Sequence, residues 1–298
     1  MADIFDAIAV EHGPRFIEDV AAAAEALGLQ GRAGSLSELS SAMGLSEGSL
    51  QRLVDGLRLG GWIVDSADGT VRVSALPKAS RETALPLTRA LRDGPVPIPN
   101  AQAYQRSVFE SGRAVAAASL GPLDLRAARR VLDAGGGAGG YTQALVEAAP
   151  GARVQLADRP EVLGLAARWL PPAVANRVDL TPTDLAQETP AGPWDAIWLA
   201  NVVHWFSADG ARDLVARLAS VLAPGGVIAI KEPRLEDDRA GTRTALLFNL
   251  SLLAYAPGDG IPTVGAVSGW LAESGLHVTV HLTRESPNSI VWCGRRMV

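Results

Sequence analysis

The sequence predicts an α/β protein with a Rossmann-like, doubly wound sheet, an antiparallel C-terminal hairpin and an N-terminal, mostly α winged-helix domain. Three observations predict this fold. Strand patterns alternate with helical patterns between residues 128 and 233, a rhythm typical of a parallel sheet covered by helices. A glycine-rich stretch follows the first of those strands. Two further strand patterns lie near the C-terminus, joined by only about six residues, which is too few for a parallel crossover.

Bulk composition is that of an ordinary soluble protein. The 298 residues are enough for two unequal domains, and 48% of them are apolar and 20% charged. A net charge of −5 gives no general attraction to nucleic acid or to an anionic membrane. The first residues, MADIFDAIAVEHG, lack the basic start of a signal peptide, and no apolar run approaches the ~20 residues of a membrane span. The single cysteine, Cys293, cannot form an internal disulfide, so we expect a cytoplasmic protein.

Helix signals dominate the first part of the chain. Residues 16–29 have helical spacing and composition. Ser35, with Glu38 three residues later, has the pattern of a capping box for a short helix. Gly44 is suited to end that helix, and Ser46 to cap a second one.

A hairpin and a linker complete the predicted N-terminal domain. Apolar and polar residues alternate on both sides of the turn Ala67-Asp68-Gly69, which indicates a two-stranded wing after the two helices. Residues 92–100 then contain three prolines in nine positions, as expected for a linker. We therefore predict a winged-helix-like dimerisation or lid domain over residues 1–100 and a catalytic domain over residues 101–298.

A winged helix can bind DNA, but the charge of this one argues against it. Residues 1–75 contain five arginines and no lysine, against eleven aspartates and glutamates. A domain that reads a DNA groove needs net positive charge to neutralise phosphates. An oligomerisation or substrate-lid module is the preferred interpretation.

The rest of the chain gives the alternating pattern named above. Helices are predicted at residues 101–120, 141–150, 161–170 and 210–222. Strands are predicted at residues 128–135, 152–158, 177–184, 194–203 and 225–233, and the terminal hairpin at residues 276–283 and 289–296.

The glycine-rich stretch and the acids around it predict a nucleoside-containing ligand. Gly135, Gly137 and Gly139 follow a strand and precede a helix, where they let a ligand approach the main chain, as in sites for NAD, FAD and S-adenosylmethionine. Asp133 precedes them, and a carboxylate there suits an ammonium group better than a pyrophosphate. Asp158, at the end of the next strand, can accept hydrogen bonds from two ribose hydroxyls.

Together these motifs resemble the class I S-adenosylmethionine-dependent methyltransferases. The motifs are D-x-G-x-G-x-G, the acid at Asp158, WDAIWLANVVHWF, LAPGGVIAIKE and the terminal hairpin. The chain is most similar to small-molecule O-methyltransferases with an N-terminal winged-helix dimerisation domain, which implies a homodimer whose winged helices cover the active sites. The resemblance implies S-adenosyl-L-methionine as cofactor and S-adenosyl-L-homocysteine as product. The expected cofactor-binding residues are Asp133, Gly135, Gly137, Gly139, Asp158, Arg159, Asp184, Leu185 and Asn201. For Asp184, a helix-capping role is the alternative to a contact with the adenine amino group.

The catalytic residues implied by the resemblance are His204 and Glu232. His204 follows the strand WDAIWLANVV, and the family uses a histidine there as general base for a substrate hydroxyl. Glu232 matches the glutamate that orients this histidine. The chain departs from the family in two ways: His-Asp-Trp is replaced by His204-Trp205-Phe206, and the segment GDGIPTVGAVSGW lacks the family's second glutamate.

An apolar substrate pocket is expected beside the histidine. Trp205 and Phe206 can pack on a ring, and the predicted helix at residues 243–260 lines the substrate site in the resembling family. That helix contributes the candidate contacts Asn249, Leu252 and Tyr255, although core packing alone also explains its apolar stripe. Tyr104 and Arg106 are further candidates, placed to close over the methionine end of the cofactor.

The predicted function is methylation of a small, aromatic or polyketide-like secondary metabolite, with oxygen as the first-choice acceptor. Two alternatives stay open: a C- or N-methyltransferase, and an enzyme that keeps the cofactor but catalyses a pericyclic or isomerising step. The His, Cys, Asp and Glu residues show no metal-ligand spacing, so no metal is expected.

Overall fold

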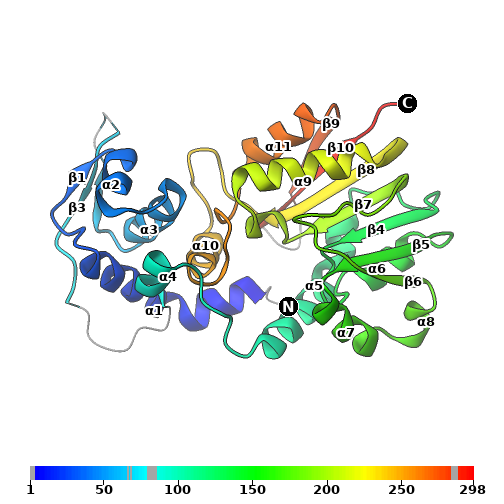
Figure 1. Ribbon diagram of the computed structural model, residues 1–298, viewed down its shortest axis with the longest axis horizontal. Helices are drawn as coiled ribbons and strands as arrows, with labels where there is room; N and C mark the ends of the chain where they lie inside the picture. Colours follow the sequence, from blue (N-terminus) through cyan, green and yellow to red (C-terminus); the bar gives the residue numbers. More distant parts are fainter. Residues whose placement is uncertain (1–3, 66, 68, 79–85, 283–287) are drawn as a thin grey trace.

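The C-terminal half of the molecule is built on a seven-stranded sheet, seen in the computed structural model (Figure 1). The structure describes residues 4–65, 67, 69–78, 86–282 and 288–298, with side chains from residue 15 onward. The strand order is β6-β5-β4-β7-β8-β10-β9. These strands are β4 (Arg130–Ala134), β5 (Arg153–Asp158), β6 (Val178–Pro182), β7 (Trp194–Ala200), β8 (Leu222–Pro233), β9 (His277–Leu282) and β10 (Ser289–Arg295).

Strand directions confirm the predicted sheet and its hairpin. The pairs formed by β4 with β5, β4 with β7, β5 with β6 and β7 with β8 are parallel. By contrast, β10 runs antiparallel to both β8 and β9, as its short connection to β9 requires. Part of that connection, residues 283–287, lies outside the described residues. From β4 the chain adds β5 and then β6 on one side, and it then returns to add β7 and β8 on the other side of β4. The direction of winding therefore changes between β4 and β7, and open α/β sheets bind ligands at such a point.

Helices cover both faces of this sheet and bury its apolar side chains. On one face, α5, α6, α7 and α8 pack with Val131, Val154 and Trp198, and on the other α9 and α11 pack with Leu132, Ile197 and Ile230. These helices are α5 (Ala101–Leu120), α6 (Thr142–Ala148), α7 (Pro160–Trp169), α8 (Pro172–Ala175), α9 (Ala208–Ser220) and α11 (Val264–Glu273), with a short 3₁₀ helix, η1 (Val203–Trp205), after β7. No helix in the described ranges has the length and apolar character to cross a membrane.

The N-terminal half contains the predicted helices and a small sheet of order β1-β3-β2. Ser35 and Glu38 form the expected capping box, Gly44 ends the helix in the left-handed conformation at φ 66°, and Ser46 caps the next helix. The elements are α1 (Ile4–Ala26), β1 (Ala33–Gly34), α2 (Leu36–Met43), α3 (Glu47–Leu59), β2 (Ile63–Asp65), β3 (Val71–Val73) and α4 (Leu87–Asp93).

Three details differ from the sequence expectation in this half. Helix α1 begins at Ile4, well before the predicted start, and β1 adds a third strand to the wing. The strands β2 and β3 pair antiparallel as expected, but residues 66 and 68 of their turn, including Asp68, lie outside the described residues. The division of the chain into domains at residue 100 stays a prediction.

Helix α10 (Arg243–Tyr255) joins the two halves, and it lies between them in Figure 1. Its Leu247, Leu250, Leu253 and Ala254 share one apolar core with side chains of α1 and α3. Phe248 of α10 belongs to a separate small core with Leu235 and Leu252. The predicted helix was too long, because residues 256–260 leave α10 and form a loop. The N-terminal region is thus packed onto a helix of the C-terminal half.

A buried carboxylate reinforces this contact. The side chain of Asp55 in α3 is 7% exposed. It accepts hydrogen bonds from Arg239, which lies in the loop after β8, at 2.9 Å from Nε and 2.7 Å from Nη2. Arg58 Nη1 at 3.2 Å and Gln51 Nε2 at 2.8 Å also donate to Asp55. Burial lowers the pKa of nearby Arg52 to about 10; the charge of Asp259 opposes this shift and the charge of Arg239 adds to it, so positive charge in this region depends on nearby carboxylates.

We expect Asp55→Ala to lower the free energy of unfolding by about 2–3 kcal/mol, because it leaves arginines partly buried without their carboxylate. Asp65→Ala is the matched control, since Asp65 pairs with the same Arg58 at the surface and should cost under about 1 kcal/mol. Urea unfolding of both variants measures the difference. Equal effects would show that Asp55 does not stabilise the contact between the two halves.

Candidate active site

The glycine-rich loop lies between β4 and α6, with backbone exposed to a cavity of about 700 Å³. Gly137 has φ 61°, which favours glycine, and the nearest atom to an added Cβ would be Gln105 Oε1 at 3.8 Å, so the space before it is open. At Gly136 a Cβ would lie 2.6 Å from the Asp133 carboxyl group. The loop therefore has to be free of side chains both for its own packing and for access to its backbone.

Asp133 is a buried carboxyl group in the cavity wall. It is 1% exposed, and its Oδ2 accepts a hydrogen bond from Thr142 Oγ1 at 2.7 Å. Burial raises the pKa of Asp133 to about 7, and the nearby charge of Asp158 adds to the effect, while the Thr142 hydrogen bond opposes it. A ligand ammonium beside this group would stabilise its ionised form, which fits the predicted role.

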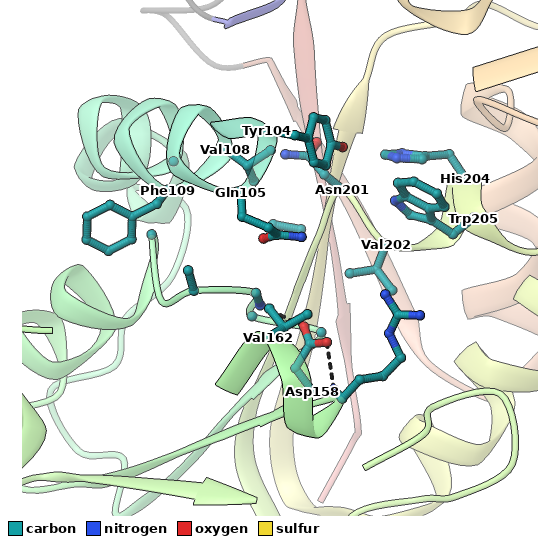
Figure 2. A pocket seen from close by; sticks show the side chains of 18 of the residues that line it. Tyr104, Gln105, Val108, Phe109, Asp158, Val162, Asn201, Val202, His204 and Trp205 are labelled. Atoms are coloured by element: carbon teal, nitrogen blue, oxygen red, sulfur yellow. Dashed lines mark hydrogen bonds between the residues drawn. The ribbon is translucent and has the colours of Figure 1, made fainter. Parts of the chain in front are cut away.

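Asp158 ends β5 on the side of the cavity next to the loop (Figure 2). Its Oδ2 accepts a hydrogen bond from the Gly137 N–H at 2.8 Å, and its Oδ1 from the Arg159 N–H at 2.7 Å. Burial raises the pKa of Asp158, and these two hydrogen bonds oppose the shift. Each oxygen keeps a lone pair for another donor, so the carboxylate is fixed in place and can still accept from a diol.

Of the remaining predicted cofactor residues, Gly135, Arg159, Asp184, Leu185 and Asn201 line this cavity. Gly139 does not line it, and a Cβ there would lie 2.8 Å from Leu170 Cδ2, so this glycine serves the packing of the loop. Asp184 Oδ1 accepts from the Ala186 N–H at 3.0 Å, which closes a turn, since no helix directly follows Asp184 in the described chain, and both Asp184 and Leu185 line the cavity. Asn201 has φ 57°, and within the described chain its buried Oδ1 has no hydrogen-bond partner. Because buried acceptors are normally paired, this oxygen fits a ligand donor. The carboxyl groups of Asp133 and Asp158, the glycine loop and the Asn201 Oδ1 atom together suit an adenosyl amino acid as ligand.

His204 and Glu232 form a buried pair at the edge of the same cavity. His204 lies in η1 and Glu232 near the end of β8, and His204 Nδ1 is 2.6 Å from Glu232 Oε2. Glu232 Oε1 accepts from the N–H groups of Val202 at 2.9 Å and Val203 at 3.0 Å. Both side chains are at most 1% exposed. Three partners thus fix the Glu232 carboxylate, which in turn keeps the imidazole proton on Nδ1 and leaves Nε2 as the acceptor of the imidazole.

Aromatic rings surround His204. Phe248 of α10 meets it edge-on, with ring centroids 5.4 Å apart, and Trp205 lies 5.8 Å away. Figure 2 shows His204 and Trp205 on one side of the cavity and Tyr104, Gln105 and Val108 of α5 on another. Of the predicted substrate residues, Tyr104, Trp205, Phe206 and Tyr255 line the cavity. Burial raises the pKa of Tyr104 to about 12, so its phenol stays protonated and can donate a hydrogen bond.

Asn249, Leu252 and Arg106 do not lie where the sequence placed them. Asn249 is 2% exposed, and its Oδ1 accepts from the Ile261 N–H at 2.9 Å, which holds the loop after α10 rather than a substrate. Leu252 is buried in a small core with Leu235. Arg106 pairs with Glu110 and stacks on Trp169, away from the cavity lining. Helix periodicity identified the helices but not which turn faces the cavity.

Other lining residues were missed by sequence reasoning. Val96, Pro97 and Ile98 belong to the segment predicted as a linker, yet they form part of the wall, and the Val96 N–H donates to Ala254 O at 2.9 Å. Lys231 and Phe248 also line the cavity. The sequence contains one indication that Lys231 lies at a functional site, which is that a charged residue stands inside the apolar strand GGVIAIKEP. In the described ranges, no cluster of three or more His, Cys, Asp or Glu side chains could hold a metal ion.

Known proteins resemble this chain in sequence. It is 27% identical over 194 residues to 3-hydroxy-5-methyl-1-naphthoate 3-O-methyltransferase of Streptomyces sahachiroi, covering 64% of this chain and 56% of the relative. It is 29% identical over 136 residues to 3-amino-4-hydroxybenzoate 4-O-methyltransferase of Streptomyces cremeus, covering 45% of this chain and 37% of the relative. The matched region thus spans about half of these relatives or less.

Solved structures agree over nearly the whole chain. An O-methyltransferase family 2 protein of Planctomyces limnophilus in complex with apigenin has a TM-score of 0.82 at 25% identity, covering 99% of this chain and 97% of that one. Human N-acetylserotonin methyltransferase in complex with SAM shares the fold, with a TM-score of 0.62 at 18% identity, covering 97% of this chain and 96% of that one. A model of the O-methyltransferase domain matches residues 99–261, more than half of the sequence. The chain therefore belongs to the O-methyltransferase domain family.

Proposed function

We propose that this protein is an S-adenosylmethionine-dependent methyltransferase that methylates a hydroxyl group of a small aromatic metabolite. The observation that carries the proposal is the buried His204–Glu232 pair at the edge of the cavity that also holds the glycine loop, Asp133 and Asp158. One cavity thus offers a proton acceptor, a site for an adenosyl amino acid and space for an acceptor molecule.

The cofactor would be held by residues along the carboxyl edge of β4, β5 and β7. Asp158 is placed to accept from the ribose hydroxyls, Asp133 to face the ammonium group, and Asn201 Oδ1 to accept a further hydrogen bond. When bound, the cofactor supplies an electrophilic methyl group on a sulfonium. Membership of the family and solved relatives bound to SAM or to SAH support this assignment.

His204 would remove the proton of the substrate hydroxyl. Glu232 keeps the proton of the imidazole on Nδ1, so Nε2 receives the substrate proton as the oxygen attacks, and the same carboxylate stabilises the imidazolium that forms. Only this one carboxylate hydrogen-bonds His204 among the described residues, and the second glutamate expected from the family is absent. A phenol, which is already fairly acidic, suits a base supported in this way.

The acceptor would be flat and largely apolar. The walls beside His204 are Trp205, Phe206, Phe248, Ile98 and Val108, while Tyr104 and Tyr255 provide hydroxyl groups. The names of the relatives fit this class, since they act on a hydroxynaphthoate and an aminohydroxybenzoate, and one structure contains apigenin.

Incubation with S-adenosylmethionine carrying a trideuterated methyl group tests the proposal. The panel would contain a hydroxynaphthoate, an aminohydroxybenzoate and a flavone with a single hydroxyl group, each beside its O-methyl ether as a matched control. We expect a product heavier by one CD₃ group in place of hydrogen, from the free phenol only, by mass spectrometry. Labelled product from the ethers would indicate methylation at carbon, at nitrogen or at the carboxylate, which fragmentation of the product distinguishes, and an unlabelled isomer would indicate a non-methylating enzyme.

We also propose a homodimer formed through the N-terminal region, acting in the cytoplasm. Support comes from the family resemblance and from the acidic charge balance of residues 1–75, which disfavours a nucleic acid partner. Light scattering after size exclusion should give twice the chain mass of 31.0 kDa. A single-chain mass at micromolar concentration would contradict the dimer and leave the enzymatic assignment intact.

A further inference from the structure

The loop that follows α10 lies directly against the segment that carries the proposed base. This loop, residues 257–261, reads PGDGI. The Asp259 N–H donates to Phe206 O at 3.0 Å, and Asp259 Oδ2 accepts the Ala208 N–H at 2.8 Å. A Cβ added at Gly258 would lie 2.4 Å from Phe206 O, so the two backbones are in close contact. The loop therefore holds the backbone just beyond the base.

Glu232 holds the other end of the same segment. Its Oε1 accepts the N–H groups of Val202 and Val203, and its Oε2 lies 2.6 Å from His204 Nδ1. The two aromatic residues that follow the histidine line the cavity. Two carboxyl groups thus hold the base and the aromatic wall from both ends, Glu232 before them and Asp259 after them.

Asn249 of α10 anchors the loop from inside the protein. It is 2% exposed, and its Oδ1 accepts the Ile261 N–H at 2.9 Å. Gly260, at φ 84°, lets this amide come close, since a Cβ there would lie 2.3 Å from Asn249 Oδ1. The preceding residue, Phe248, meets the imidazole of His204 edge-on. One turn of α10 therefore packs on the base and also sets the position of the loop.

Helix α3 supports the loop from the N-terminal half. Gly48 and Arg52 lie one turn apart on the same face of α3. A Cβ at Gly48 would lie 3.1 Å from Asp259 Oδ1, and a Cβ at Gly260 would lie 2.8 Å from Arg52 Cδ. Burial lowers the pKa of Arg52, and the charge of Asp259 opposes this shift, so the loop also offsets a buried cation. The loop is therefore held between α3 and residues 205–208.

We propose that Asn249 is a positioning residue for the acceptor, acting through the loop at residues 257–261 on the wall formed by Trp205 and Phe206. This inference rests on the proposed function. An acceptor hydroxyl must meet both His204 Nε2 and the methyl group, and a displacement of about 1 Å can lower the rate about 10²-fold. None of the contacts above involves the glycine loop, so cofactor binding should not depend on Asn249.

Kinetics with two acceptors and calorimetry with S-adenosylhomocysteine test the proposal. We expect Asn249→Ala to lower kcat/KM for a hydroxynaphthoate about 10- to 100-fold, while Kd for S-adenosylhomocysteine stays within about twofold. The loss should be smaller for an aminohydroxybenzoate, because a single ring covers less of the aromatic wall. An equal loss for both acceptors, an equal weakening of S-adenosylhomocysteine binding, or no change would overturn the positioning role.

Two further variants separate positioning from general destabilisation. Asn249→Asp keeps an acceptor for the Ile261 N–H and replaces an Nδ2 that has no hydrogen-bond partner in the described chain. It should therefore recover kcat/KM to within about threefold of the wild type. Val71→Ala trims the core of the small N-terminal sheet, away from the loop, and should leave kcat/KM for both acceptors unchanged.

A pair of glycine variants tests the loop independently of Asn249. Gly258→Ala places a methyl group against Phe206 O and should reproduce the loss of kcat/KM for the hydroxynaphthoate, with S-adenosylhomocysteine still bound. Gly269→Ala in α11 is the matched control, because a Cβ there meets no atom within 4 Å, and it should behave like the wild type. Full activity of Gly258→Ala would contradict the inference.

Hydrogen exchange measures the same coupling without turnover. We expect Asn249→Ala to speed exchange of the amides at residues 203–210 by about tenfold or more and to leave residues 135–142 unchanged. Unchanged exchange at residues 203–210 would show that the loop does not hold this segment. If the wild type methylates no acceptor, the proposed function fails while the exchange result still decides the role of the loop, so the two failures are distinguishable.

Discussion

His204→Ala is expected to lower kcat for methylation of a phenol by about 10²- to 10⁴-fold, the usual contribution of a general base. The dissociation constant for S-adenosylhomocysteine should stay within about twofold, because the imidazole bonds Glu232 and not the glycine loop. The loss should shrink as the acidity of the phenol increases, since a phenol that is already ionised needs no base. Single-turnover rates across a series of substituted phenols measure this dependence.

Two further variants make the result specific to the base. His281→Ala removes a histidine from the edge strand β9, where His281 contacts Thr279, and should leave kcat unchanged. Glu232→Gln places an amide beside Nδ1, which can favour the proton on Nε2, so we expect a loss of about 10- to 100-fold in kcat. A fully active His204→Ala protein would reduce this residue to packing, while the assignment to the methyltransferases would survive.

Asp133→Asn is expected to weaken binding of S-adenosylhomocysteine about 10²-fold at pH 8 and at the same time to stabilise the ligand-free protein. The loss of affinity follows from removing the partner of the ligand ammonium, a charged hydrogen bond. The gain in stability follows from the raised pKa of this buried carboxyl group, which is about 7 against an ordinary value of 3.8. Asparagine can still accept from Thr142 Oγ1 and carries no charge.

The sign of the stability effect depends on pH. Because the pKa of Asp133 is higher in the folded chain, folding favours the proton, and the wild type is most stable with respect to this group below about pH 4. That stability is lost as the pH rises through about 7, by at most about 4 kcal/mol. Asp133→Asn should therefore exceed the wild type by roughly 1–3 kcal/mol at pH 8 and lose this advantage at low pH. Urea unfolding at pH 5 and pH 8 measures this, and a less stable variant at pH 8 would contradict the cost of ionisation.

Short-range signals predicted most of the fold. The capping box of Ser35, the left-handed end at Gly44 and the antiparallel pairing of β9 with β10 each follow from a few neighbouring residues, and each is present as predicted. The positions of Asp133 and Asp158 beside the cavity could be predicted from the sequence for a similar reason. Parallel strands finish at one edge of the sheet, so a carboxylate at the end of a strand must lie near the ligand cavity.

Features that depend on contacts between segments far apart in the sequence could not be predicted from the sequence. The residues around Asn249 do not indicate whether its side chain faces the cavity or the loop at Ile261. Only the packing of α10 in the folded protein directs it to the loop, where it binds the Ile261 N–H. The proline-rich segment reads as a linker, yet one hydrogen bond from Val96 to Ala254 ties it to α10 as part of the cavity wall. Lys231 was missed because lysine is usually at the surface, and its burial follows only from the strands on both sides of it.

Trp205 gives the protein an optical probe of its own. Of the seven tryptophans, it is the one found in the described cavity lining, while Trp194, Trp198 and Trp292 are sealed inside the core. An aromatic acceptor stacked beside this indole would alter its fluorescence emission. Trp205→Phe would remove that ligand-dependent change in emission and leave the constant emission of the other six tryptophans. Occupancy can therefore be followed by fluorescence without any label, even before turnover is detected.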